Sequence, residues 1–319
     1  MIQILLYSSL FLIGIILLLK SADILVDGAS KMAAKLGISS LIISLIIVAY
    51  GTSAPESFVS FLAALEGYES IALGNVIGSC IANVLLVLGI SAIVRPLKVK
   101  KGIIKREMPL LVGSVLLFML VSIGGILNWI GGIILLVVFI FYITFFIGLA
   151  KREREMNNRE INNTKENKKQ QNNLSKNILF ILLGIIGVVL GAEFLIMSSI
   201  FIANSLEIPK VVIALSIVAI GTSLPELVVS SVASYKNEAD ICIGNLIGSN
   251  IFNITLILGI CSLILPIHVE MVSLLATIFL LCVNVVIIFM LYTGYSISRK
   301  EGAILLAGYF IYIFYIFSI

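Results

Sequence analysis

Gly51-Thr52-Ser53-Ala54-Pro55-Glu56 interrupts an otherwise apolar run that extends from Ile38 to Leu65. An ionised side chain in hydrocarbon costs about 2.5 kcal/mol or more, so a carboxylate there faces a protein interior and marks a transport path or relay. Proline has no N–H for the carbonyl four residues earlier, which leaves free backbone oxygens near Gly51. Two hydroxyls, free carbonyls and a carboxylate predict an oxygen-lined site for a hard cation.

The same six-residue pattern returns at Gly221-Thr222-Ser223-Leu224-Pro225-Glu226, 170 positions later. From about residue 12 to residue 89, the chain matches residues 170 positions further on without a gap. This period is far too long for a solenoid, whose repeats have about 20 to 50 residues. The chain is therefore predicted to consist of two copies of one structural unit.

The composition is typical of a membrane protein. Hydrophobic residues make up 60% of the chain and charged residues only 12%, against about a quarter charged in soluble domains. Because a spanning helix takes about 20 apolar residues, we expect about ten helices, near 2–20 (continuing to about 35), 38–65, 70–93, 108–124, 126–149, 177–203, 208–234, 240–265, 270–294 and 302–318. No basic residue precedes the first apolar run and no small-residue cleavage site follows it, so it is predicted to span the membrane rather than to be a signal peptide.

These observations predict an all-α integral membrane protein of two five-helix repeats, 1–150 and 177–319, joined by a polar linker, 151–176. Since each repeat has an odd number of spans, the two copies cross the membrane in opposite directions. In such inverted repeats the bound ligand lies at the midplane, where interrupted helices from both halves meet. Ten helices suffice for a complete pathway, so a monomer is expected to be sufficient.

The basic residues predict the orientation. They cluster after the third and fifth helices, whereas the opposite loops carry mainly acidic residues. The positive-inside rule then places both termini outside and the central linker in the cytoplasm, for a protein of the cell membrane. The net charge of +4 does not indicate nucleic-acid binding, because the basic residues lie at helix ends and form no face interleaved with aromatic residues. The lipid bilayer is the expected surrounding partner.

A second repeated motif lies on the third and eighth helices. It reads Gly74-Asn75-Val76-Ile77-Gly78-Ser79-Cys80-Ile81-Ala82-Asn83 and Gly244-Asn245-Leu246-Ile247-Gly248-Ser249-Asn250-Ile251-Phe252-Asn253. In each copy a serine and an asparagine are four residues apart, which places both on one helical face. If the repeats pack about a pseudo-twofold axis, helices 2, 3, 7 and 8 form one central ion site. The side chains expected to converge there are Glu56, Glu226, Ser79, Ser249, Asn83 and Asn253.

The residue types favour Na⁺ and Ca²⁺ as the ions. Both accept hydroxyl, amide, carbonyl and carboxylate oxygens, whereas Mg²⁺ holds its water too firmly for such a site. No His or Cys pattern indicates a transition metal, and the four cysteines have no CxxC spacing, so they are expected to be buried apolar residues. Two glutamates carry a charge of −2, which one Ca²⁺ neutralises, while two or three Na⁺ could replace it. A site that takes either ion set is expected of an antiporter.

The two GTSxPE elements, each followed by GNxIGSxxxN, resemble the alpha-repeats of sodium/calcium exchangers in the calcium/cation antiporter superfamily. The resemblance covers nearly the whole chain and implies Na⁺/Ca²⁺ antiport by alternating access, with no enzymatic activity and no cofactor. It further implies that helices 1 and 6 slide across the other eight. For Ca²⁺ it implies binding by Glu56, Glu226 and the backbone carbonyls of Thr52 and Thr222. For Na⁺ and the centre it implies the set Ala49, Ser53, Ser79, Ala219, Ser223, Ser249, Asn83 and Asn253.

One position departs from part of that family. Some microbial members and the potassium-dependent branch carry Asp where this chain has Asn253, whereas potassium-independent animal exchangers resemble this chain. Asn cannot ionise, so the site keeps a charge near −2 when both glutamates are deprotonated. Three Na⁺ against one Ca²⁺ would then move one net charge per cycle, without K⁺.

Other interpretations remain open at this level. H⁺/Ca²⁺ exchange keeps the fold, although proton-coupled relatives carry an additional Glu in the second motif, and another divalent cation is a further alternative. An intramembrane protease would need aspartates in a GxGD-type setting, which the sequence lacks. A passive channel would conduct without a counter-ion. Among the remaining features, the GxxxG spacings suit helix packing, while Asp23, Asp27, Glu193 and His268 are expected to be structural or solvated, with Asp23 near Lys20.

Overall fold

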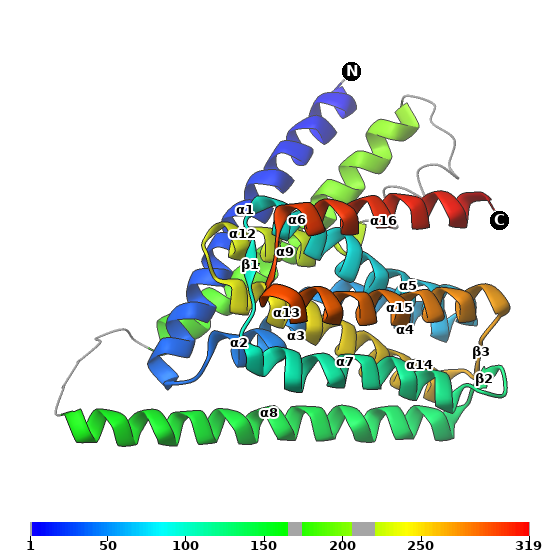
Figure 1. The fold of residues 1–319 in the computed structure, drawn as a ribbon. Coiled ribbons are helices and arrows are strands. Elements are labelled where there is room, and N and C mark those ends of the chain that lie inside the picture. Colours follow the sequence, from blue (N-terminus) through cyan, green and yellow to red (C-terminus); the bar gives the residue numbers. More distant parts are fainter. Residues whose placement is uncertain (1, 165–173, 206–220, 319) are drawn as a thin grey trace.

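The computed structural model describes residues 2–164, 174–205 and 221–318, and nearly all of them are helical (Figure 1). Among the described residues, six helices are long and apolar enough to cross a membrane, and a bent pair adds a seventh. In chain order the helices are α1 (Ile2–Leu36), α2 (Ser40–Ile43), η1 (Ser44–Val48), α3 (Ala49–Thr52), α4 (Ala54–Leu65), α5 (Glu69–Ala82), η2 (Asn83–Val87), α6 (Leu88–Val94), α7 (Lys101–Val121), α8 (Trp129–Thr164), α9 (Leu174–Ser205), α12 (Leu224–Tyr235), α13 (Ala239–Phe252), η4 (Asn253–Ile257), α14 (Leu258–Ile264), α15 (Met271–Gly294) and α16 (Arg299–Ser318), where η marks a π-helical turn.

The predicted helix ends agree with these bounds to within a few residues in most cases. α7 differs, because it begins at Lys101, seven residues before the predicted start at 108. α8 continues to Thr164, so the first part of the polar segment 151–176 is an extension of that helix. Its Lys, Arg, Glu and Met residues are good helix formers, which explains why the helix does not end with the apolar run. The first half of the helix expected at 208–234 lies outside the described residues.

The two proline motifs form the starts of helices. α3 ends at Thr52 and α4 begins at Ala54 with Pro55 in its first turn, and the two segments are bent by 48°. In the second copy α12 begins at Leu224 with Pro225 in its first turn. A first-turn N–H has no intrahelical acceptor, so proline is tolerated there. Glu56 and Glu226 therefore both lie in the first turn of a helix, where the helix dipole favours a negative charge.

Four two-residue strands, which the sequence did not predict, join the two halves of the chain. β1 (Leu97–Lys98) pairs antiparallel with β4 (Ser296–Ile297), and β2 (Ile126–Leu127) pairs antiparallel with β3 (Ile267–His268). β3 lies 170 positions after β1 and β4 lies 170 positions after β2, so the two ladders are equivalent contacts. His268 is therefore in a strand rather than a free loop, although its side chain remains 59% exposed and contacts Glu69.

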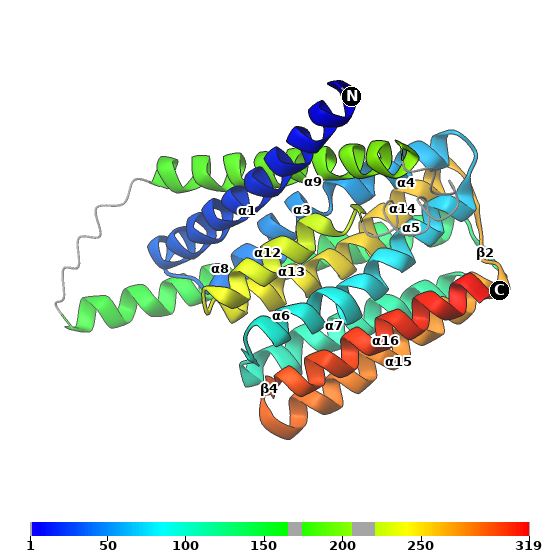
Figure 2. The same cartoon turned by 90° about the horizontal axis from the view of Figure 1, so that it is seen from above.

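α1 and α9 lie side by side and are inclined to the other long helices (Figures 1 and 2). They run antiparallel, and glycines on α9 allow their backbones to approach closely. A Cβ atom on Gly184 would lie 2.7 Å from Leu25 Cβ, and one on Gly191 would lie 2.7 Å from the Leu18 nitrogen. α1 and α9 thus form a closely packed pair at one side of the remaining helices, which hold the two proline motifs.

Candidate functional site

The two glutamates of the repeated motif meet in the interior. Glu56 on α4 and Glu226 on α12 are both fully buried. Ser53, which precedes α4, donates its hydroxyl hydrogen bond to Glu226 Oε1 at 3.0 Å. Ser223, which precedes α12, makes the reciprocal and longer contact with Glu56 Oε1 at 3.5 Å. Each half of the chain thus supplies the hydroxyl that faces the carboxylate of the other half.

Neither carboxylate is compensated by a basic residue. Oε2 of Glu56 and Oε2 of Glu226 are buried and accept no hydrogen bond. Within the described residues, no Lys, Arg or His forms an ion pair with either side chain. Burying an unpaired charge is costly, so this pair of carboxylates requires a bound cation or protons. No group of three or more His, Cys, Asp or Glu side chains that could hold a metal ion occurs within the described residues. The polar groups that lie next to the two carboxylates are hydroxyl, amide and backbone groups.

Such groups surround Glu226. The Ser249 hydroxyl on α13 lies 3.4 Å from Glu226 Oε1 and also 3.4 Å from the backbone oxygen of Ala49. The Thr52 hydroxyl donates to Asn245 Oδ1 at 3.0 Å and lies 3.3 Å from that same Ala49 oxygen. The break between helices α3 and α4 is therefore held against α13 by polar contacts at the site.

The remaining predicted residues fall into two groups. Ser79 and Thr222 are buried, but neither side chain forms a hydrogen bond within the described part of the chain. Ala219 lies outside the described residues. The structure therefore places the hydroxyls of Ser53, Ser223 and Ser249 against the two carboxylates. Thr52 and Ala49 lie beside this group through the hydrogen bonds described above, while the role expected of Ser79, Thr222 and Ala219 stays a prediction.

The two central asparagines begin corresponding π-helical turns, Asn83 in η2 and Asn253 in η4. Such turns inside α-helices are frequent at functional sites. Both side chains are buried, and Oδ1 of each accepts no hydrogen bond. Asn83 Nδ2 donates to Asn250 Oδ1 at 3.0 Å, and Asn250 Nδ2 donates in turn to the Cys80 carbonyl at 3.2 Å. Asn83 is thus linked to Asn250, which the predicted site did not include, whereas the Asn253 side chain forms no hydrogen bond within the described residues.

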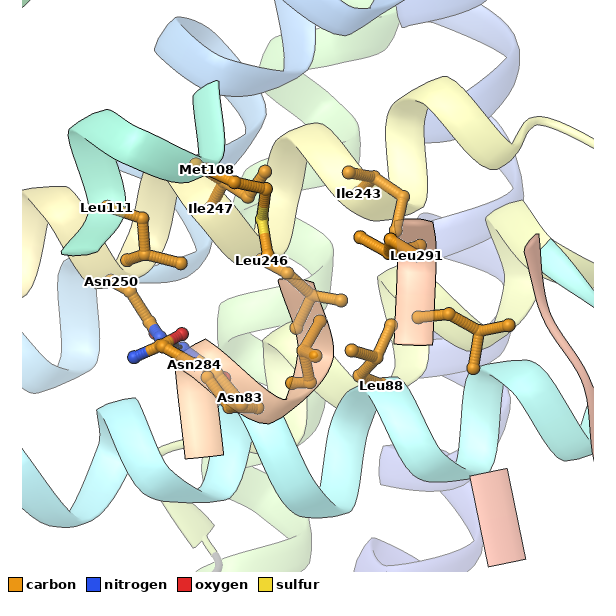
Figure 3. Close-up of a pocket in the computed structure, with 13 residues that line it drawn as sticks. Asn83, Leu88, Met108, Leu111, Ile243, Leu246, Ile247, Asn250, Asn284 and Leu291 are labelled. Atoms are coloured by element: carbon orange, nitrogen blue, oxygen red, sulfur yellow. Dashed lines mark hydrogen bonds between the residues drawn. The ribbon is translucent and has the colours of Figure 1, made fainter. Parts of the chain in front are cut away.

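Figure 3 shows that Asn83, Asn250 and Asn284 gather at one end of an otherwise apolar cavity of about 30 Å³. Asn284 lies on α15, is fully buried and leaves Oδ1 without a partner. The sequence analysis missed it, although a single amide in a 24-residue apolar helix is a signal that could have identified it. Asn250 was missed because the repeat places Cys80 at the corresponding position, so it did not appear as a matched polar pair.

Two further asparagines, at equivalent positions of the two repeats, form hydrogen bonds between helices next to the site. Asn75 Nδ2 donates to the Ser60 hydroxyl at 2.9 Å and to the Glu56 carbonyl at 3.1 Å. Asn245 Nδ2 donates to the Ser230 hydroxyl at 3.1 Å. These pairs are related by the same 170-residue shift, and each ties a glutamate-bearing helix to the helix that follows it. Their repetition in the sequence was a usable signal, because each asparagine follows the first glycine of the second motif.

Long apolar helices around a buried, oxygen-lined pair of carboxylates define an integral membrane protein with a polar interior site. Comparison with known proteins identifies the class more closely. The family described as sodium/calcium exchanger protein matches residues 6–148 and 176–318. This chain belongs to that family, which is one of ion transporters.

Individual relatives are similar to this chain over most of their length. The sodium/calcium exchanger MaX1 of Methanosarcina acetivorans is 35% identical over 97% of this chain and 98% of its own. The inner membrane protein YrbG of Escherichia coli is 35% identical over 82% of this chain and 81% of its own. The sodium-calcium exchanger NCX_Mj, soaked with zero Na⁺ and Ca²⁺, superposes with a TM-score of 0.84 at 34% identity, over 98% of this chain and 99% of that one. The same exchanger soaked with 10 mM Na⁺ and 10 mM Sr²⁺ gives a TM-score of 0.82.

Proposed function

We propose that this protein exchanges Na⁺ for Ca²⁺ across the cell membrane by alternating access. The observation that carries the proposal is the buried pair Glu56 and Glu226, bridged by Ser53 and Ser223, with one unpartnered oxygen on each carboxylate. The charge of −2 is neutralised by one Ca²⁺, and two or three Na⁺ can replace that ion. Because an unpaired buried charge is costly, the site is unfavourable without ions, and this couples the movement of one ion to the return of the other.

We infer that the fold is ten spanning helices in two inverted repeats, with both termini outside and the linker in the cytoplasm. The support is the 170-residue correspondence of elements: α4 with α12, α5 with α13, η2 with η4, and α6 with α14. The two strand ladders obey the same correspondence. The four elements that carry the two motifs then lie around one centre, as inverted-repeat transporters require.

For the ions we propose the ligands that the family resemblance implies. Ca²⁺ is bound by Glu56, Glu226 and the backbone oxygens of Thr52 and Thr222. The flanking Na⁺ ligands come from Ala49, Ser53 and Ser79 in one half and from Ala219, Ser223 and Ser249 in the other, with Asn83 and Asn253 at the centre. Since Asn253 adds no charge, three Na⁺ exchange for one Ca²⁺, and transport is electrogenic and independent of K⁺.

Purified protein in proteoliposomes tests this function. We expect ⁴⁵Ca²⁺ uptake when Na⁺ is trapped inside and absent outside, and no uptake when a pH gradient of equal size replaces the Na⁺ gradient. Adding K⁺ on both sides should leave the rate of ⁴⁵Ca²⁺ uptake unchanged. A membrane potential that is negative outside should change this rate. Uptake driven by the pH gradient alone would instead assign the protein to H⁺/Ca²⁺ exchange. If no gradient drives uptake, the antiport proposal is wrong.

Ser53→Ala should weaken Ca²⁺ binding about tenfold, because hydrogen bonds to charged groups contribute about 1.5–3 kcal/mol. Its hydroxyl contacts Glu226 directly at 3.0 Å. Ser57→Ala is the matched control, since the Ser57 hydroxyl donates only to the Ser53 carbonyl within α4. The half-saturating Ca²⁺ concentration for exchange measures both variants. Equal values for Ser53→Ala and Ser57→Ala would exclude a direct role for the Ser53 hydroxyl.

A further inference from the structure

A group of charged residues outside the ion site joins α1 to the connection between α12 and α13. Lys236 Nζ lies 2.6 Å from Asp23 Oδ1 and 2.6 Å from Asp27 Oδ1, and it also donates to the Asp23 carbonyl at 3.2 Å. One turn further along α1, the Ser30 hydroxyl donates to Glu238 Oε1 at 2.6 Å. The sequence analysis expected Asp23 near Lys20, and its partner is instead a lysine 213 positions away.

These contacts are more than a single exposed pair. The Lys236 side chain is only 22% exposed and binds two carboxylates. Partial burial by itself would lower the pKa of the Lys236 ammonium, but hydrogen bonds and attraction from Asp23 and Asp27 outweigh that effect and raise the pKa above its ordinary value. The lysine is therefore charged at physiological pH, and the contacts tie α1 to the helix pair that carries Glu226 and Ser249.

The other half of the chain cannot form the same contacts. Shifting by 170 positions replaces Lys236 by Glu66 and Asp23 by Glu193, and it replaces Asp27 by an uncharged methionine. Glu66 and Glu193 are both exposed in the structure, and neither forms an ion pair within the described part of the chain. The attraction found in one half thus corresponds to a like-charge pair in the other half.

The α1–α9 pair is placed asymmetrically against the two proline motifs. A Cβ atom on Gly51 would meet Ile185 at 2.5 Å, and one on Gly221 would meet Ile196 at 2.7 Å, so both motif glycines face α9. In a symmetric arrangement, one of them would face α9 and the other would face α1. The described arrangement is therefore one of two that the repeat allows, and the second follows by exchanging the roles of the halves.

We propose that Lys236, Asp23 and Asp27 form an ionic latch that holds α1 against the α12–α13 connection in the described conformation only. In the exchanged conformation the corresponding residues, Glu66 and Glu193, repel each other and form no latch. The latch therefore shifts the equilibrium between the two conformations toward the described one. This inference rests on the proposed alternating access, in which the two conformations interconvert during transport.

Hydrogen–deuterium exchange of the reconstituted protein tests the bias. Exposed ion pairs contribute up to about 1 kcal/mol each, so Lys236→Gln should shift the ratio of the conformers about threefold to tenfold. Exchange at residues 27–36 and 235–239 should rise by that factor. Lys31→Gln is the matched control, because Lys31 contacts Asp27 within α1 and reaches no other helix. Equal exchange in Lys236→Gln and Lys31→Gln would overturn the latch.

A cross-link tests the movement itself. Ser30→Cys with Glu238→Cys, in a Cys282→Ala background, is joined by a short bis-methanethiosulfonate reagent, which forms a disulfide with each thiol and releases a sulfinate each time. The linked protein should lose ⁴⁵Ca²⁺ flux until the two disulfides are reduced. Arg95→Cys with Tyr235→Cys is the control, because those exposed residues also touch but neither belongs to α1 or α9, and flux should persist. Flux that survives the first link overturns the latch. Absence of flux in the unmodified protein would refute the proposed function, while the exchange measurement would still report on the contacts.

Discussion

Ca²⁺ flux is expected to fall at least about 30-fold when either Glu56 or Glu226 is replaced by glutamine. Each substitution removes one of the two charges in a fully buried site, and removing one member of a buried charge pair costs about 2–5 kcal/mol. At about 1.4 kcal/mol per decade of affinity, that loss leaves Ca²⁺ unbound at working concentrations. Na⁺-driven ⁴⁵Ca²⁺ uptake in proteoliposomes is the measurement.

The same substitutions should not unfold the protein. Glutamine has nearly the shape of glutamate and removes a buried charge that no basic residue compensates, so the ion-free variants should melt at or above the temperature of the wild type. Ligand binding raises the melting temperature only if the site binds the ligand. Added Ca²⁺ should therefore stabilise the wild type and neither variant.

Glu107→Gln separates a site effect from a general effect of burying glutamine. Glu107 on α7 is as fully buried as the two site residues, but it is paired with Arg106 and lies outside the two repeated motifs. Its variant should retain both flux and stabilisation by Ca²⁺. If Glu107→Gln loses as much flux as the Glu56 and Glu226 variants, the loss in those variants no longer supports the proposed ion site.

Gly248→Ala is expected to lower both flux and stability, although it adds a single methyl group. A Cβ atom there would lie 2.5 Å from the Leu45 carbonyl oxygen and 2.6 Å from Ala49 Cβ. The first atom belongs to the backbone of η1, and the second is the Cβ of the first residue of α3, which no side-chain rotation can move. The helices must therefore separate, at a cost of about 1–3 kcal/mol. Because Ser249 contacts both Ala49 and Glu226, the separation also displaces a site residue, and flux should fall about tenfold.

Gly113→Ala provides the comparison for Gly248→Ala. Gly113 lies inside α7, is exposed, and would place its Cβ within 4 Å of no other described atom. An alanine there should stabilise the helix by about 0.5–1 kcal/mol and leave flux unchanged. Thermal unfolding in detergent and initial rates of uptake measure both variants. A Gly248→Ala protein with wild-type melting and flux would show that the close packing of α13 is not required.

The sequence predicted the helices and the break near Pro55 well, because both depend on local properties. A run of about 20 apolar residues leaves few alternatives to a spanning helix, and proline removes a backbone donor wherever it stands. The internal repeat identified which polar residues matter, since Glu56, Ser53 and their counterparts are matched across 170 positions. Asn284 and Asn250 were not found by that comparison, because neither has an asparagine as its counterpart.

The sequence alone determined that the chain is a helical membrane protein with two related halves and two acidic residues in apolar surroundings. Only the tertiary structure decided which oxygens face each carboxylate, and that Asp23 pairs with Lys236 and not with Lys20. It also decided that four short strands connect the two halves. The physical reason is distance along the chain. Hydropathy and proline act locally along the chain, whereas these contacts join residues at least 140 positions apart. Their geometry follows from how whole helices pack.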